Sequence, residues 1–109
     1  MTKVTVNPGN CGFTVSVTAE KGERKKINIS LDTECEMVMK MVDEISVLDM
    51  KSLFTNFLSN PVYRCASKHL KHTACPVPGA ILKAAEVELG LCVPEDVKIH
   101  FKKQDEKAE

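Results

Sequence analysis

Two short runs of alternating apolar and polar residues constrain the fold of this chain more than any other feature. The runs are residues 13–19 (FTVSVTA) and 27–31 (INISL), and the polar segment between them contains Gly22. A period of two places every second side chain on the same face, as in a strand with one buried face. The pair therefore predicts a β-hairpin with a loop of several residues.

The hairpin also predicts which residues meet at its open end. If the loop is centred near Gly22 or Glu23, the numbers of opposite residues add to about 45. Extending that register places Cys11 beside Glu34 or Cys35. A slip of one or two residues would loosen this contact without abolishing it. We therefore expect Cys11 and Cys35 to meet at one end of the sheet.

Two further segments have strand patterns, and the central part of the chain has helical ones. Residues 2–6 (TKVTV) predict a strand that ends at the turn NPGN, and residues 97–101 (VKIHF) predict the last strand. Thr33 and Glu36 fit a capping box at the start of a helix that ends near Ser46. Its predicted apolar face consists of Met37, Val38, Met41, Val42 and Ile45.

The second half of the chain predicts further helices. Residues 49–58 have the pattern of a short helix, and Asn60-Pro61 ends it and opens another helical turn through Cys65. Pro76-Val77-Pro78 begins a final helix, because a proline in the first turn removes no helical hydrogen bond, and Gly90 ends it. The predicted inward residues are Leu53, Phe54, Phe57 and Leu58 in the short helix and Ile81, Leu82, Ala85 and Leu89 in the final one.

This order of elements predicts an α+β fold, in which helices pack on one face of a small, mostly antiparallel sheet. The length of 109 residues suits one domain. We expect residues 1–102 to form it and residues 103–109, which are charged, to fray.

Composition argues against several classes of partner. Fifteen basic and fifteen acidic residues cancel, so no strong field favours nucleic acid. No apolar run approaches the roughly 18 residues of a membrane span, and the N-terminus lacks the apolar core of a signal peptide. We expect a cytoplasmic protein that binds neither nucleic acid nor membrane, with a protein partner possible. Five cysteines in that compartment are expected to be reduced.

Cys11, Cys35 and Cys75 fall at the ends of predicted elements rather than within apolar faces. Cys35 and Cys75 lie at predicted helix starts, where free N–H groups and the helix dipole stabilise a thiolate and lower its pKa. A free cysteine is also a common core residue. Cys92, between Leu91 and Val93, fits that structural role best.

Two sets of these residues fit a metal. Cys65, His69, His72 and Cys75 have the spacing C-x3-H-x2-H-x2-C, and such side chains bind zinc tetrahedrally, although the two histidines also fit a lysine-rich surface. If this segment is helical, Cys65 and His69 share one face at i, i+4. The second set is Cys11, Cys35 and Cys75, with His72 or Cys65 as a fourth ligand. Soft thiolates suit zinc or an iron–sulfur cluster.

Cys75-Pro76-Val77-Pro78, followed by an amphipathic helix, resembles the CPxP motif of small sulfur-carrier proteins. In those carriers the cysteine bears a persulfide, so the resemblance implies that Cys75 is a nucleophile. The motif precedes the first helix of those smaller domains, whereas here it precedes the last.

A wider resemblance is to a small uncharacterised family of about this length from anaerobic bacteria and archaea. It is carried by NPGNCGF (7–13), DTEC (32–35), CPVPGAILKAAEVELGL (75–91) and the PEDVKI that follows. The resemblance implies no established activity, but it fits a reducing cytoplasm.

The leading hypothesis is a small cytoplasmic protein that binds a metal ion or iron–sulfur cluster through Cys11, Cys35 and Cys75. One alternative is a sulfur carrier or thiol redox protein with Cys75 as nucleophile. The other is a non-catalytic structural or interaction module with inert cysteines. The sequence leaves open whether the protein is an enzyme.

Overall fold

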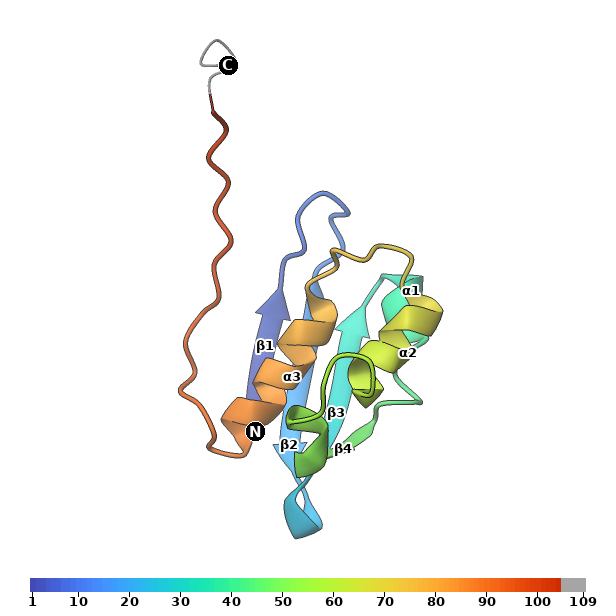
Figure 1. Cartoon of the computed structure of the whole chain (residues 1–109), viewed down its shortest axis with the longest axis vertical. Helices are drawn as coiled ribbons and strands as arrows, with labels where there is room; N and C mark the ends of the chain where they lie inside the picture. The colour runs from blue at the N-terminus through green and yellow to red at the C-terminus, as the bar shows by residue number, and fades with distance from the viewer. Residues whose placement is uncertain (105–109) are drawn as a thin grey trace.

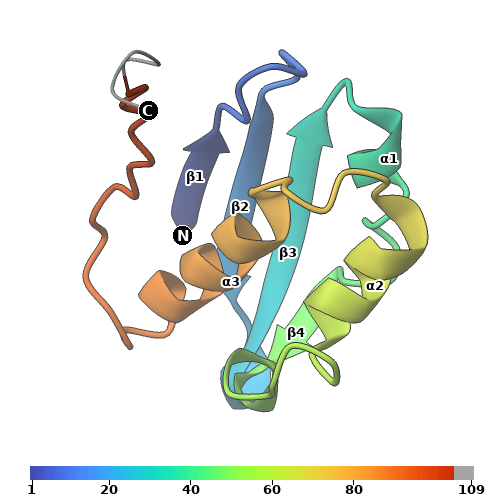
Figure 2. The same ribbon diagram turned by 45° about the horizontal axis from the view of Figure 1, so that its top comes forward.

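A computed structural model describes residues 1–104, and shows one sheet with helices on one of its faces (Figures 1 and 2). The sheet is antiparallel, with four strands in the order β1-β2-β3-β4. This confirms the predicted α+β fold. The strands are β1 (Thr2–Val6), β2 (Val15–Lys21), β3 (Lys26–Thr33) and β4 (Val47–Asp49); the helices are α1 (Glu36–Met39), α2 (Pro61–His69), α3 (Val77–Glu88) and the short 3-10 helices η1 (Glu23–Lys25) and η2 (Met50–Leu53).

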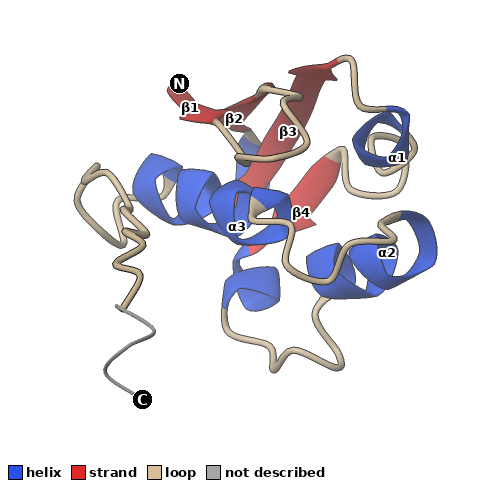
Figure 3. Cartoon of the chain, turned by 90° about the horizontal axis from the view of Figure 1, so that it is seen from above, coloured by secondary structure: helices blue, strands red, loops and turns tan. Residues whose placement is uncertain are grey.

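The core lies between the sheet and the helices, as the view from above shows (Figure 3). Alternate residues of β2 and β3 are buried, whereas their neighbours are partly or fully exposed on the open face of the sheet. α3 lies over β1 and β2 and buries Ile81, Ala84 and Ala85 completely. Because alanines occupy the contact, the helix axis approaches the sheet closely. The buried strand residues are Val15, Val17 and Ala19 in β2 and Ile27, Ile29 and Leu31 in β3.

The predicted hairpin is present, but its register differs. Val17 faces Leu31, where the predicted register gives Asn28, because the turn is centred on Arg24. Arg24 and the next residue adopt left-handed backbone angles that close this turn. β2 also begins at Val15 rather than at Phe13, and its pairing with β1 likewise ends there, at Val6. Cys11 therefore lies in the β1–β2 loop, and the hairpin register does not place it beside Cys35.

The predicted helix over residues 37–45 is mostly absent, although its apolar stripe is correct. Val38, Met41 and Ile45 are buried, yet α1 ends at Met39 and successive turns continue the chain. The carbonyl of Ser46 accepts a hydrogen bond from the N–H of Ile29 at 2.8 Å. The chain must therefore leave the helical path to reach β3.

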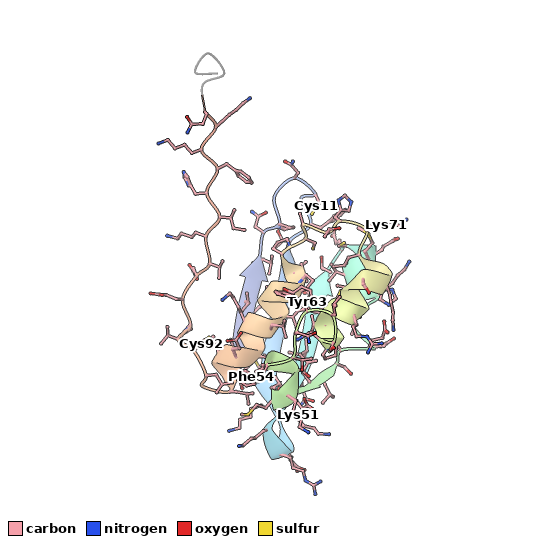
Figure 4. The ribbon with its side chains drawn as sticks, viewed as in Figure 1. Cys11, Lys51, Phe54, Tyr63, Lys71 and Cys92 are labelled. Atoms are coloured by element: carbon pink, nitrogen blue, oxygen red, sulfur yellow. The ribbon has the colours of Figure 1, made fainter. Side chains whose placement is uncertain are left out.

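The predicted helix over residues 49–58 is also wrong. Val47–Asp49 instead pairs with β3 as β4, and only η2 is helical. Leu53 packs against the core, but three predicted inward residues, Phe54, Phe57 and Leu58, are exposed (Phe54 is labelled in Figure 4). The helical turns stop at Leu53, and the carbonyl of Ser52 accepts a hydrogen bond from the side chain of Asn60.

The ends of α2 and α3 follow their capping residues. The Asn60 side-chain oxygen accepts hydrogen bonds from the N–H groups of Val62 and Tyr63, at 2.9 and 3.4 Å. At the end of α3, Gly90 has a φ of +75°, and the N–H of Leu91 donates to the carbonyl of Glu86 at 2.9 Å. This pattern is a Schellman motif, which favours glycine at the left-handed position.

The predicted strand over residues 97–101 is absent. The chain beyond Leu91 runs away from the body with no regular structure as far as residue 104, and it pairs with none of the four strands of the sheet (Figure 1). Most of the predicted charged tail, residues 105–109, lies outside the described residues. No helix within residues 1–104 has the length and apolar character needed to cross a bilayer.

Asn60→Ala is expected to lower the free energy of unfolding by about 2 kcal/mol, because it removes the α2 cap and leaves the buried Ser52 carbonyl without its partner. Asn56→Ala is the matched control, since exposed Asn56 accepts one hydrogen bond from the N–H of Ser59. Its expected cost is about 0.5 kcal/mol or less. Urea denaturation measures both, and equal losses would contradict this role for Asn60.

Candidate functional site

Three cysteines distant in sequence lie at the end of the sheet where α3 begins, which we call the thiol end. β1 and β3 both run toward this end (Figure 1), so the loop after β1 carries Cys11 and the residue that caps α1 after β3 is Cys35. Cys75 immediately precedes Pro76, the N-cap of α3. Figure 4 shows Cys11 at this end and Cys92 at the opposite end, where the chain leaves the body.

Cys75 lies within electrostatic range of both Cys35 and Cys11, although the three sulfur atoms do not all lie within 4.8 Å of one another. Burial raises the pKa of the Cys75 thiol, and negative charge on Cys35 and Cys11 raises it further. A hydrogen bond from the backbone N–H of Val77 acts in the opposite direction. The helix start therefore stabilises the thiolate as predicted, but it does not produce the predicted low pKa, because desolvation is the larger effect.

The three thiols form a gradient from solvent to core. Cys11 is exposed, Cys75 is half-buried and Cys35 is buried. The loop that carries Cys11 turns at Gly9 and Gly12, which have φ values of +95° and +73°, and the N–H of Gly12 donates to the carbonyl of Gly9 at 3.0 Å. An open groove runs beside this loop. It is lined by Gly12, Phe13, Thr14, Ser16, Asp32, Thr33 and Glu34.

The local setting of Cys35 differs from the predicted capping box. The hydroxyl oxygen of Thr33 accepts a hydrogen bond from the N–H of Cys35 at 3.1 Å. Thr33 is the last residue of β3, and Cys35 is itself the N-cap residue of α1. Cys35 thus lies one step outside the helix rather than in its first turn.

A second group of candidate ligands lies between α2 and the turns after α1, and we call it the Glu44 cluster. It consists of Glu44, Cys65 and His69, whose ligand atoms all lie within 4.8 Å of one another. Cys65 and His69 share a face of α2, as their spacing predicted. The Cys65 thiol donates to Glu44 Oε2 at 3.4 Å, His69 Nε2 contacts the same oxygen, and Lys68 Nζ lies 3.0 Å from Oε1.

In the Glu44 cluster, the surroundings favour the ionised form of Glu44 and the protonated form of Cys65. Hydrogen bonds from Lys68, His69 and Cys65 lower the pKa of Glu44 from 4.5 to about 2. Burial, followed by the hydrogen bond to Glu44 and its negative charge, raises the pKa of Cys65 to about 12. At neutral pH, the cluster therefore consists of a carboxylate that accepts hydrogen bonds from a neutral thiol and from Lys68.

The structure divides the predicted C-x3-H-x2-H-x2-C set into two parts. Cys65 and His69 belong to the Glu44 cluster, whereas Cys75 lies at the thiol end, with its N–H bonded to the carbonyl of His72 at 3.1 Å. Among residues 1–104, no other triad of such ligands lies within 4.8 Å of one another. No sequence signal pointed to Glu44, because its partners lie more than twenty positions away.

One family model covers nearly the whole chain, from residue 2 to residue 101. The chain belongs to the family of unknown function DUF6951. The match includes both groups of ligands and most of the segment that leaves the body after α3. It fits the predicted small, uncharacterised family. No curated protein and no solved structure matches the chain.

Exposure and pKa predict different reactivities for the cysteines of this DUF6951 protein. A thiol reagent at neutral pH should label Cys11 and Cys92 first and Cys75 more slowly. Cys65 should label only when the protein unfolds, since it is 3% exposed and its pKa is about 12. Mass spectrometry of labelled peptides over time measures the order. Labelling of Cys65 as fast as Cys92 would contradict the structure.

Glu44→Gln should destabilise the protein at neutral pH but not in strong acid. The pKa of Glu44 falls from 4.5 to about 2 on folding, so its ionised form contributes stability above pH 4.5 and loses that contribution as pH drops toward 2. Urea denaturation of both proteins across this range measures the effect. A difference that does not shrink over that interval would refute it; Glu34→Gln, at an exposed position, is the control.

Proposed function

We propose that this protein binds a soft metal ion, either zinc or the iron of an iron–sulfur cluster, through the thiolates of Cys11, Cys35 and Cys75. The observation that carries the proposal is the position of the three thiols at one end of the sheet, where negative charge on Cys35 and Cys11 opposes the ionisation of Cys75. Their sulfur atoms do not all lie within 4.8 Å of one another, so a bound ion must bring them closer together. A bound cation offsets the effects that oppose ionisation of Cys75 and stabilises its thiolate. The three cysteines come from three separate segments of the chain, so the site forms only when the chain folds.

His72 is the best candidate for a fourth ligand. It lies three positions before Cys75 in the same turn, and its side chain is exposed. Cys65 is unsuited to this role, because its sulfur is directed at Glu44 and at the carbonyl of Met41. Three thiolates and one imidazole form a known zinc ligand set.

The test is metal binding by protein purified without oxygen, which matches the reducing cytoplasm proposed for it. Elemental analysis should find zinc or iron, and cobalt added to metal-free protein should give a sulfur-to-cobalt charge-transfer band. That band should weaken strongly in Cys11→Ser, Cys35→Ser and Cys75→Ser. Binding should also release protons, since the Cys75 thiol has a raised pKa and must ionise.

Cys92→Ser is the matched control, because Cys92 is exposed at the opposite end of the molecule (Figure 4) and should leave the band unchanged. A band lost equally in all four variants, or one equivalent of protein that binds less than a tenth of an equivalent of metal, would refute the proposal. Metal-free protein that gains a sulfur atom on Cys75 from a persulfide donor would instead support the sulfur-carrier alternative.

The Glu44 cluster is a second candidate metal site. Its support is geometric: a carboxylate, a thiol and an imidazole already lie within 4.8 Å of one another. Lys68 and the raised pKa of Cys65 oppose a cation there, so we rank it second. Cobalt binding that persists in Cys75→Ser and is lost in His69→Ala would assign the metal to this cluster.

A further inference from the structure

The segment after α3, residues 92–104, which we call the C-terminal arm, contains a run with the sequence of a strand but pairs with no strand within residues 1–104. Val97, Ile99 and Phe101 alternate with Lys98 and His100. The three apolar side chains are 63%, 76% and 91% exposed. An alternating run whose apolar side chains are all exposed to water has the sequence pattern of a strand that pairs with the edge of a sheet.

β1 supplies an edge of matching length. It pairs with β2 on one side only and has five residues, as does the run 97–101. Val4 packs against the core but stays half-buried, since none of the other described strands pairs with the outer edge of β1. The opposite edge of the sheet, β4, has only three residues, which gives an added strand less to pair with.

The arm leaves the body beside the start of β1 but does not return along it. Glu88 holds the end of α3 there: its carboxylate accepts a hydrogen bond from the hydroxyl of Thr2 at 2.7 Å and lies 3.3 Å from the N-terminal amine. Pro94 then restricts its own φ, and the N–H of Glu95 donates to the carbonyl of Val93 at 2.9 Å. Beyond this tight turn the chain continues outward as an arm (Figure 1). In this direction the apolar run lies off its own sheet.

We propose that residues 97–101 of one copy add a strand to the β1 edge of a second copy, and that two copies exchange arms in this way. The donor segment and the acceptor edge are on the same chain and are matched in length, so the exchange is mutual and closes as a two-fold dimer. Pairing satisfies the free backbone groups of β1, and Val97, Ile99 and Phe101 cover its exposed apolar side. The DUF6951 match extends to Phe101 and therefore includes this run.

The test measures the mass of the full-length protein by light scattering across micromolar to millimolar concentrations. The wild-type chain should be a dimer that dissociates on dilution. Ile99→Asp with Phe101→Asp should weaken dimerisation by about tenfold or more, because it places charges in the apolar contact. Lys98→Gln with His100→Gln, on the other side of the same run, is the matched control and should remain dimeric.

Hydrogen exchange at β1 identifies the acceptor. Amides of Lys3 and Thr5 whose N–H groups face the edge should exchange more slowly in the dimer than in the aspartate variant. A chain that is monomeric at all concentrations overturns the proposal, as does a dimer unaffected by the aspartate substitutions. Protected β1 amides in a monomer also overturn it, since the arm would then fold onto its own edge. None of these outcomes depends on metal binding, so they test the exchange of arms independently of the proposed metal site at the thiol end.

Discussion

The packing of α3 against β1 and β2 is the contact on which the remaining structure depends. Ile81, Ala84 and Ala85 are fully buried, and the two alanines allow the helix to lie close to the sheet. Its position decides what happens at both ends. The helix begins where β1 and β3 end, which brings Cys75 to the loops that carry Cys11 and Cys35. It ends at Glu88, whose pKa is lowered by hydrogen bonds from Thr2 and Lys21, and whose carboxylate ties it to the sheet.

The thiol end combines two opposed electrostatic effects. The first N–H groups of α3 favour a negative sulfur at Cys75, whereas burial and the neighbouring thiols disfavour it. Burial has the larger effect, so it favours the protonated form of Cys75. The soft cation that we propose for this end supplies the positive charge that favours its thiolate. In the Glu44 cluster, by contrast, Lys68 already supplies the positive charge, and the carboxylate is satisfied by hydrogen bonds.

The sequence predictions succeeded where neighbouring residues determine the backbone conformation and failed where residues distant in sequence determine it. The hairpin, the start of the final helix and its end at Gly90 were correct, because alternation, proline and glycine act within a few residues. The stripe through Val38, Met41 and Ile45 was also correct about burial. It was wrong about the helix, since turns that satisfy the same stripe leave the Ser46 carbonyl free for Ile29. β4 was missed because its strand conformation arises from pairing with β3.

The candidate sites divide in the same way. The spacing of Cys65 and His69 predicted their shared helix face, but Glu44 came from a turn that no pattern linked to them. The sequence also singled out Cys11, Cys35 and Cys75, but for a partly wrong reason. The expected hairpin register was incorrect, and these residues lie at one end because β1, β3 and α3 begin or end there.

By itself, the sequence determined the class of fold, the faces that are buried and the cysteines at the ends of elements, because periodicity and turn chemistry act over short distances. Only the tertiary structure decided the strand register, the division of the ligands into two groups and the fact that residues 97–101 pair with no strand in the described part of the chain. These features depend on which distant segments come to lie side by side, and a strand is completed only by the backbone of another strand.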